Sequence, residues 1–282
     1  MPPERLASGE LWGLLRSQLL YRFPPFAHRR LVRFYRGFLP AGGLAFDIGA
    51  HLGNRSLALL AAGLRVVALE PQPLFARRLA VLARRHPKLT VLPVAAAAAP
   101  GRLTLALSPR TPTVATASPD FRALMEQAGV RYAGTLAVEA VTLDQLVARF
   151  GLPDFVKIDA EGMEREILLG LSAPPAVVAF EHLPQRLQAS RDCLARLLAL
   201  GPFRFNAVTG EGRRFHFPSP LDPEEFGAAL ARPPLSRRAG DIYAFRITRC
   251  AGEETAVRPA DGDPAAAPGP PSAPPECPPP GG

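Results

Sequence analysis

Short apolar runs alternate with segments of helical periodicity along the middle of this 282-residue chain. A run that is apolar at nearly every position is typical of a strand buried on both faces of a parallel sheet, whereas apolar residues three and four positions apart indicate an amphipathic helix. The runs predict strands at 44–48, 65–70, 89–95, 155–159, 176–181, 203–208 and 241–247. The helical spacing predicts helices near 54–62, 73–85, 142–150, 163–170 and 185–200. This alternation indicates βα units on a parallel sheet, which is an α/β fold.

Three segments depart from this alternation. Leucine and aromatic residues recur at helical spacing at 11–19 and 31–38, which predicts two amphipathic helices ahead of the main domain. Residues 251–282 hold ten of the 33 prolines and little that could be buried, so a disordered tail is predicted. The stretch 101–141 predicts two further strands around a short helix, an insertion beside the sheet. We therefore divide the chain into N-terminal helices (1–40), a main domain (41–250) and the tail (251–282).

Composition narrows the class of protein. The formal net charge is +8 and the isoelectric point about 10.2, but only residues 1–40, with seven arginines against two glutamates, concentrate basic charge. Nucleic-acid binding is therefore disfavoured, and for the N-terminal helices we prefer packing on the domain over the alternative of contact with a membrane surface. The three cysteines have neither disulfide nor zinc spacing, and no run has the quality of a signal peptide or the ~18 apolar residues of a membrane span. We expect a cytoplasmic protein.

The stretch LAFDIGAHLGNRSLALLAAG predicts a buried strand, a glycine-containing turn and a helix. Gly49 and Gly53 would allow positive φ and a close approach to a ligand, and the start of the helix would offer free N–H groups. Glu70 ends the next strand, where its carboxylate could accept both hydroxyls of a ribose; the alternative is a tight turn with Glu70 in solvent. The turn lacks the third glycine of G-x-G-x-x-G, and Asp47 would repel a diphosphate, so a cationic ligand such as S-adenosylmethionine (SAM) suits it better than a dinucleotide. His51, inside the turn, is a candidate contact to cofactor or acceptor, or a base.

Charged residues follow an apolar run in the stretch DFVKIDAEGMERE. Lys157, Asp159 and Glu161 occupy alternate positions and should project on one side at the carboxyl edge of the sheet, where open α/β sheets place their ligands. Glu181 and His182 end the adjacent strand. A carboxylate or imidazole at this edge is a candidate general base for a hydroxyl nucleophile, and Lys157 would keep Asp159 ionised. For Glu161 the alternative is a contact with the dipole of the following helix, and we favour the site role.

Five motifs, FDIGAHLGN, VVALEPQP, VTLDQL, DFVKIDAEGMEREILLGL and VVAFEH, occur in the order and approximate spacing of the FkbM family of SAM-dependent methyltransferases. The chain resembles this family over residues 40–250. The resemblance implies a Rossmann-like class I methyltransferase fold, with a seven-stranded sheet of order 3-2-1-4-5-7-6 whose last strand is antiparallel. It also implies methyl transfer from SAM to a hydroxyl of a sugar, another small metabolite or a glycan.

Residue chemistry and resemblance together give a set of expected site residues. The expected cofactor contacts are Asp47, Gly49, His51, Gly53 and Asn54 toward the methionine end, Glu70 at the ribose and the backbone near Ala96 at the adenine. The candidate catalytic residues are Asp159, Glu161, Glu181 and His182. No metal is expected, because nothing in the spacing of the acids fixes a ligand geometry.

Two other classes of function stay open from the sequence. A nicotinamide-dependent oxidoreductase would share the strand, glycine turn and helix, but it lacks support from a third glycine or a second nucleotide-binding half. A non-catalytic Rossmann-like protein that binds a partner or a membrane would have no need of Asp47, Gly49, Glu70 and Asp159 together. We therefore rank both below the methyltransferase.

Overall fold

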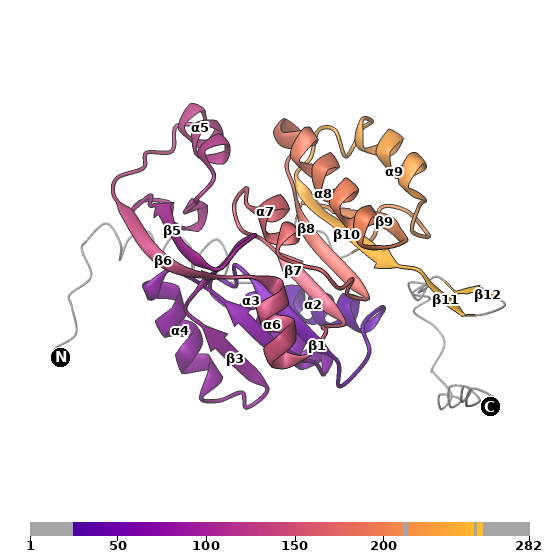
Figure 1. The fold of residues 1–282 in the computed structure, drawn as a ribbon, viewed down its shortest axis with the longest axis horizontal. Helices are drawn as coiled ribbons and strands as arrows, with labels where there is room; N and C mark the ends of the chain where they lie inside the picture. The colour runs from indigo at the N-terminus through magenta and orange to yellow at the C-terminus, as the bar shows by residue number, and fades with distance from the viewer. Residues whose placement is uncertain (1–24, 211–213, 251–252, 256–282) are drawn as a thin grey trace.

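The computed structural model describes residues 25–210, 214–250 and 253–255 (Figure 1). Its centre is a seven-stranded sheet formed by β1 (Leu44–Ile48), β2 (Arg65–Leu69), β3 (Leu89–Leu92), β7 (Phe155–Ile158), β8 (Val177–His182), β9 (Phe203–Thr209) and β10 (Gly240–Arg246). The strands lie in the order β3-β2-β1-β7-β8-β10-β9, and β10 is antiparallel to both of its neighbours. Counted along the chain, this is the order 3-2-1-4-5-7-6 that the resemblance implies. The predicted fold class is confirmed.

Helices cover both faces of this sheet (Figure 1). One face carries α6 (Leu143–Phe150), α7 (Glu164–Leu169), α8 (Leu187–Leu200) and α9 (Pro223–Leu230). The opposite face carries α2 (Pro25–Arg36), α3 (Asn54–Ala62) and α4 (Pro73–Ala83). A short 3-10 turn, η2 (Pro184–Arg186), leads into α8. The main domain is therefore a three-layer α/β/α structure, with the carboxyl ends of the parallel strands left open at one edge.

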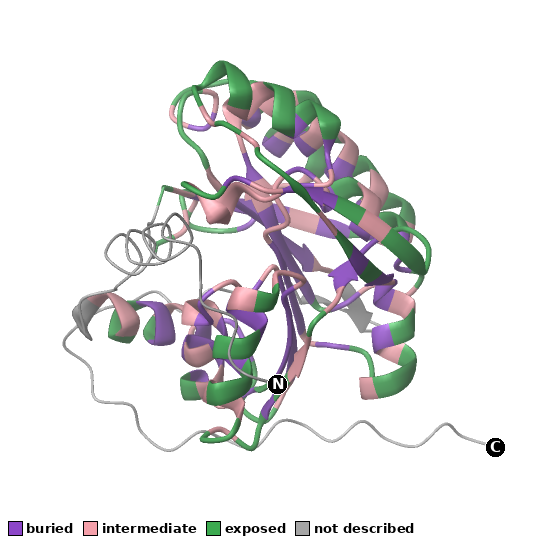
Figure 2. Ribbon diagram, turned by 90° about the vertical axis from the view of Figure 1, so that its left-hand side faces the viewer, coloured by how far each residue is buried: buried purple, intermediate pink, exposed green. Residues whose placement is uncertain are grey.

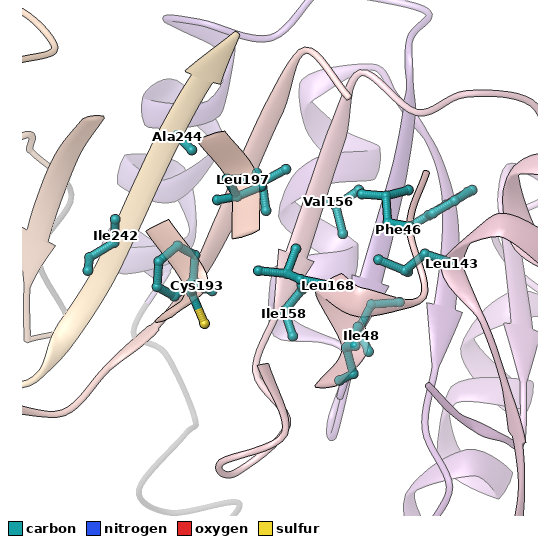
Figure 3. Close-up of a cluster of buried hydrophobic side chains, with 14 of the residues drawn as sticks. Phe46, Ile48, Leu143, Val156, Ile158, Leu168, Cys193, Leu197, Ile242 and Ala244 are labelled. Atoms are coloured by element: carbon teal, nitrogen blue, oxygen red, sulfur yellow. The ribbon is translucent and has the colours of Figure 1, made fainter. Parts of the chain in front are cut away.

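Alternate residues of the central strands point into the two layers, because successive side chains of a strand face opposite sides of its sheet. Figure 2 shows the strands buried between helices whose outer faces are exposed. Figure 3 shows the layer under α6, α7 and α8, in which buried side chains of the sheet pack against buried side chains of the helices. The labelled members are Phe46, Ile48, Leu143, Val156, Ile158, Leu168, Cys193, Leu197, Ile242 and Ala244. Each large apolar side chain buried in this way contributes roughly 1.5–3 kcal/mol relative to exposure.

Helix α2 packs on the opposite face through an aromatic cluster. Phe34 and Phe38 lie against Phe215 and Tyr243, with ring centroids 4.8 to 5.8 Å apart. The arginines of the helix are exposed; they are Arg29, Arg30, Arg33 and Arg36. The helix thus packs on the domain and keeps its charges in solvent, which is the interpretation preferred from the sequence. Its buried residues belong to the same hydrophobic cluster as buried residues of β1, β2, β7, β8 and β10.

The 101–141 insertion builds a second sheet beside the main one. The insertion contributes β5 (Gly101–Ala106) and β6 (Thr135–Val141), with η1 (Pro112–Val114) and α5 (Pro119–Gln127) between them. The short strand β4 (Ala95–Ala96), which precedes the insertion, completes the sheet in the order β4-β6-β5. The strand predicted at 89–95 is wrong beyond Leu92. Pro93 has no N–H to donate to the ladder, so β3 ends there and Ala95–Ala96 joins the insertion sheet instead.

The carboxy-terminal part of the chain holds two further differences from the sequence-based expectations. Helix α9 lies where the apolar pattern predicts no helix, although Asp222, whose carboxylate accepts a hydrogen bond from the Glu225 N–H, is a helix start signal. Strand β12 (Glu253–Thr255) pairs with β11 (Thr248–Cys250), so the predicted disorder of the tail does not hold for these three residues. The rest of that tail and the helix expected around 11–19 lie outside the described residues. None of the described helices is long and apolar enough to cross a membrane.

Candidate active site

Two neighbouring cavities open at the carboxyl ends of β1 and β7. The first has a volume of about 140 Å³ and the second about 250 Å³. They share four lining residues, two from the turn after β1 and two from the segment after β7, namely Gly49, His51, Asp159 and Glu161. We call these four residues the junction. A group held in one cavity can meet a group held in the other only across it.

The turn after β1 brings the backbone against the end of β7. Gly49 has a φ of 79°, and a Cβ atom at this position would overlap the carbonyl oxygen of Asp159. Gly53 also has a positive φ, 82°, and a Cβ there would lie 2.7 Å from Leu79 Cδ2 on α4. Gly53 lines neither cavity. It starts α3 close to α4, and the cofactor contact expected for it stays a prediction.

Glu70 follows β2 and closes one side of the first cavity. One of its oxygens accepts a hydrogen bond from the His51 N–H and the other from the Gln72 N–H, both at 2.9 Å. The side chain is 3% exposed, and burial raises its pKa to about 7, against the opposing effect of the two N–H donors. Each carboxylate oxygen has a second lone pair, so Glu70 can still accept hydroxyls from a bound ligand. The sequence-based alternative of Glu70 in solvent does not hold.

The walls of the first cavity come from both sheets. Apolar residues of the two sheets and of the segments next to them line it, and these are Ile48, Leu69, Val94, Ala95, Ala96, Leu103, Leu105 and Met163. The segment after η1 closes the cavity from the insertion side, where Gln72 Nε2 donates to Pro112 O at 3.1 Å and Thr116 Oγ1 donates to Glu161 O at 2.7 Å. The insertion is therefore a wall of the site, and Ala96 lies in that wall, while the adenine contact expected of its backbone stays a prediction.

A network of ion pairs forms the floor of the second cavity. Lys157, completely buried, lies 3.0 Å from Asp241 and 3.4 Å from Asp159. Arg55 lies 3.1 Å from Asp241 and 3.8 Å from Asp159. Burial alone would lower the pKa of Lys157, but Asp159 and Asp241 outweigh it and raise that pKa. The pairing of Lys157 with Asp159 agrees with the sequence analysis.

Two members of this network, Arg55 and Asp241, are not among the residues expected from the sequence. They meet because the sheet order places β10 beside β8, where Asp241 pairs in register with Glu181. The only local signal is an acid at the start of an otherwise apolar strand, GDIYAF. The contact between Arg55 and Asp241 therefore depends on which strands are neighbours in the folded sheet, and it could not be deduced from motif spacing.

Asp47 and Asn54 line the second cavity and not the first. Asp47 is in register with Lys157 on the neighbouring strand, and its carboxylate accepts a hydrogen bond from Ser56 Oγ. Burial raises its pKa, and the hydroxyl of Ser56 opposes that shift. Two of the residues expected at the methionine end of a cofactor, Asp47 and Asn54, thus fall on the far side of the junction from Glu70. A ligand that contacted both Glu70 and Asp47 would have to pass through it.

Glu161 and Glu181 face the second cavity from two different strand ends. Glu161 has a φ of 51°, and its backbone is held by Thr116 and by Glu164, which accepts hydrogen bonds at 3.2 Å from the N–H groups of Ala160 and Gly162. Burial, then Glu181 and Asp159, raise the pKa of Glu161. Burial, then Asp159, raise that of Glu181. A non-glycine residue with positive φ is uncommon and costs energy, so its retention beside a cavity points to a functional position.

The two histidines of the expected site have different environments. His51 lies at the junction, with its ring 4.0 Å from that of Phe75, and burial lowers its pKa to about 4, so the ring is neutral at pH 7. His182 points to the opposite face of β8 from Glu181. Its Nδ1 is 2.8 Å from Ser190 Oγ and its Nε2 is 3.0 Å from Leu235 O, and it lines neither cavity. The structure therefore separates His182 from the other candidate catalytic residues, because neighbouring residues of a strand face opposite sides.

Comparison with known proteins identifies the central part of the chain. Residues 47–174 match the family model of the methyltransferase FkbM domain. No curated protein matches the sequence.

Solved structures with a similar arrangement include three methyltransferases. An O-methyltransferase from Bacillus cereus in complex with SAH is 15% identical, with 87% of this chain and 93% of that chain covered and a TM-score of 0.41. Precorrin-6y C5,15-methyltransferase from Geobacter metallireducens is 14% identical, with 77% and 87% covered and a TM-score of 0.40. A putative RNA methyltransferase from Pyrococcus horikoshii is 16% identical, with 80% and 85% covered and a TM-score of 0.40. The family match over residues 47–174 agrees with the resemblance to the FkbM methyltransferases that the sequence motifs indicate.

Proposed function

We propose that this protein is a SAM-dependent methyltransferase that methylates a hydroxyl of a small-molecule or glycan acceptor. The observation that carries the proposal is the pair of cavities that meet at a junction containing two acids, within a domain that matches a methyltransferase family. When bound, SAM supplies the methyl group: the acceptor oxygen forms the new C–O bond, the C–S bond breaks with its electron pair going to sulfur, and neutral S-adenosylhomocysteine (SAH) remains. The rest of the chemistry is alignment and removal of one proton, both of which the protein must provide.

The residues of the first cavity fit the cofactor. Glu70 offers two carboxylate oxygens at the end of β2, where they can accept the hydroxyls of the ribose. The turn at Gly49 has no room for a side chain and leaves its backbone open to the cavity. The apolar walls around Ala96 and Met163 suit the flat face of the adenine. Asp47 and Asn54, which line the second cavity beyond the junction, would hold the charged methionine end.

Glu161 is the best candidate for the general base. Asp159 is engaged by both Lys157 and Arg55, whereas no described residue forms an ion pair or a hydrogen bond with the Glu161 carboxylate. Glu161 lines both cavities, so it can reach a hydroxyl placed beside the transferred methyl group. Burial, then Glu181 and Asp159, raise the pKa of Glu161, which suits a group that takes up a proton in the reaction. Asp159 then serves to fix the floor of the site.

The second cavity suits a neutral or cationic acceptor. Five carboxylates line it, from Asp47, Asp159, Glu161, Glu181 and Asp241, and Arg55 is the cation among the lining residues that the structure describes. An anionic acceptor would be repelled, whereas hydroxyl groups can donate hydrogen bonds to the acids. A polyhydroxylated compound such as a sugar therefore matches the lining.

The proposal is tested by thermal shift and calorimetry with SAM, SAH and NAD. Ligand at 100 times its dissociation constant stabilises the folded state by about 2.7 kcal/mol, which is measurable as a shift in Tm. We expect SAM and SAH to stabilise the protein and NAD to have no effect. Stabilisation by NAD alone would favour an oxidoreductase, and no effect of any of the three would favour a non-catalytic protein.

The ionisation of Glu70 should control cofactor affinity. Its pKa is raised to about 7 in the folded protein, and ribose hydroxyls donate better to the ionised carboxylate, so binding should favour loss of the proton. We expect the affinity for SAH to rise severalfold from pH 6 to pH 8 and then to level off. Calorimetric titration at four pH values measures this. The Glu70→Gln variant should bind SAH more weakly, and its affinity should not rise between pH 6 and pH 8. If the same rise occurred in this variant, a group other than Glu70 would be the one that titrates.

Base and cofactor roles should separate in two variants. Glu161→Gln should keep the affinity for SAH and lose turnover by a factor of about 10² or more, the usual contribution of a general base. Glu70→Ala should weaken SAH and SAM alike. Turnover is followed by the formation of SAH once an acceptor is found in a screen of hydroxylated compounds. Full turnover in Glu161→Gln would transfer the role of base to another residue.

A further inference from the structure

Glu161 and Glu181 differ from the other acids of the site in having no partner. Asp159 and Asp241 are paired with Lys157 and Arg55, and Asp47 accepts a hydrogen bond from Ser56. Within the part of the chain that the structure describes, neither the Glu161 nor the Glu181 side chain makes an ion pair or a hydrogen bond. Two carboxyl groups without a counter-charge, both half-buried, thus face one cavity from β8 and from the segment after β7.

The position of Glu161 places this pair next to the transferred group. Glu161 lines both cavities, and the methyl group must cross from the first to the second. With the cofactor in the first cavity and the acceptor in the second, as proposed, the sulfur that carries the methyl group would lie at the junction. That atom is a sulfonium cation in SAM and an uncharged thioether in SAH, while the two ligands are otherwise alike in charge.

Several charged or titratable groups surround the pair and set the local charge. Those that face Glu161 and Glu181 from the packed elements are Asp47, His51, Arg55, Glu70, Tyr132, Lys157, Asp159, Glu164, Arg186 and Asp241. The cations among them are Arg55 and Lys157, which are already paired, and Arg186, which donates to Gly162 O. The local balance is negative, and a positive charge at the junction is the change that would relieve it.

On the basis of the proposed function, we infer that Glu161 and Glu181 distinguish the charged donor from its neutral product, so that the site binds SAM in preference to SAH and releases a proton when SAM binds. The preference follows from Coulomb attraction in a half-buried site, where it exceeds its value in water. The proton release follows from the raised pKa of both groups, since a nearby cation favours their ionised forms. Binding of the donor would thereby put Glu161 into the form that can act as the base, and loss of the charge after transfer would favour release of the product.

Calorimetry with three ligands tests this inference without any acceptor. SAM, SAH and sinefungin, an analogue with an amine-bearing carbon in place of the sulfonium, are titrated into the full chain at pH 7 in two buffers of different ionisation enthalpy. We expect SAM to bind about tenfold more tightly than SAH, which corresponds to about 1.4 kcal/mol, and sinefungin to follow SAM. We also expect SAM to release more protons than SAH. Protons released by Glu70 do not affect the difference between SAM and SAH, because both ligands carry the same ribose and Glu70 would contact it in the same way.

Variants assign the effect to the two acids. Glu161→Gln and Glu181→Gln should each reduce the ratio of SAH to SAM dissociation constants, and the double variant should bring it near one. SAH affinity should be unchanged in all of them, which also shows that the variants fold. The matched control is Glu166→Gln, because Glu166 lies on α7 five residues further along, pairs with Arg165 at 3.1 Å and lines neither cavity. This control should keep the wild-type ratio.

The outcomes separate the inference from the function on which it rests. Equal binding of SAM and SAH by the wild type would overturn the inference and leave the methyltransferase proposal standing. A preference that survives in the double variant would overturn the assignment to these acids. Absence of binding by both ligands would overturn the proposed function and the inference together.

Discussion

Replacement of Gly49 by alanine is expected to destabilise the protein by about 3 kcal/mol or more and to abolish cofactor binding. A Cβ at this position would overlap the carbonyl oxygen of Asp159. Both atoms are attached directly to the backbone at the ends of the paired strands β1 and β7, so neither can move aside by rotating a side chain. The clash can be relieved only by moving β1 and β7 apart at the junction. The backbone there also has a φ of 79°, which adds the cost of the left-handed region for alanine.

The matched control for this substitution is Gly129→Ala. Gly129 has a similar φ of 88°, but a Cβ there would meet no atom within 4 Å. We therefore expect Gly129→Ala to cost about 1 kcal/mol, from backbone strain alone, and to leave cofactor binding unchanged. Urea unfolding and titration with SAH measure the two effects. Equal losses of stability in the two variants would mean that the close approach of Gly49 to Asp159 is not the reason why this turn requires glycine.

Much of the fold follows from local sequence signals. The strands of the main sheet are continuous apolar runs, and that pattern survives because each strand is covered by helices on both faces. The order of the strands came from the family resemblance, since apolar patterning does not specify which strands pair. The error at 89–95 shows the limit of the pattern, because one proline moved Ala95–Ala96 from the main sheet to the insertion. Helix α9 has a start signal at Asp222 but only eight residues, which gave little periodicity to detect.

The candidate site also contains residues that could be placed from the sequence and residues that could not. Gly49, Glu70, Asp159 and Glu161 could be placed from the sequence because each follows a strand, and the carboxyl ends of parallel strands meet at one edge. His182 could not be separated from Glu181 without knowing which face of β8 is covered by α8, where Ser190 binds its ring. Arg55 and Asp241 depend on the reversed strand β10, so their role is visible only in the folded structure.

Lys157→Met should be the most destabilising charge substitution at the site, with an expected loss of 3–5 kcal/mol at pH 7, because it leaves buried carboxylates without their cation. Lys157 is completely buried and lies 3.0 Å from Asp241 and 3.4 Å from Asp159. Arg55 remains, but it already pairs with both acids from the other side. Removing an exposed cation should have little effect: Arg165→Met, which breaks the pair with Glu166, should change stability by less than about 0.5 kcal/mol.

A double-variant cycle distinguishes an unpaired charge from a simple loss of packing. Asp241→Asn in the Lys157→Met background removes one of the abandoned carboxylates, so we expect it to recover about 2 kcal/mol, whereas the same change in the wild type should destabilise. The pKa of Lys157 is raised in the folded state, so its contribution is fully present below its unfolded pKa and is lost only as the pH rises through the folded value. The difference between wild type and Lys157→Met should therefore be constant from pH 7 to pH 9. If the losses of stability from Lys157→Met and Asp241→Asn simply added, Lys157 would stabilise the protein only through the packing of its hydrocarbon chain. The ion-pair network would then not be what holds Asp159 in place at the junction.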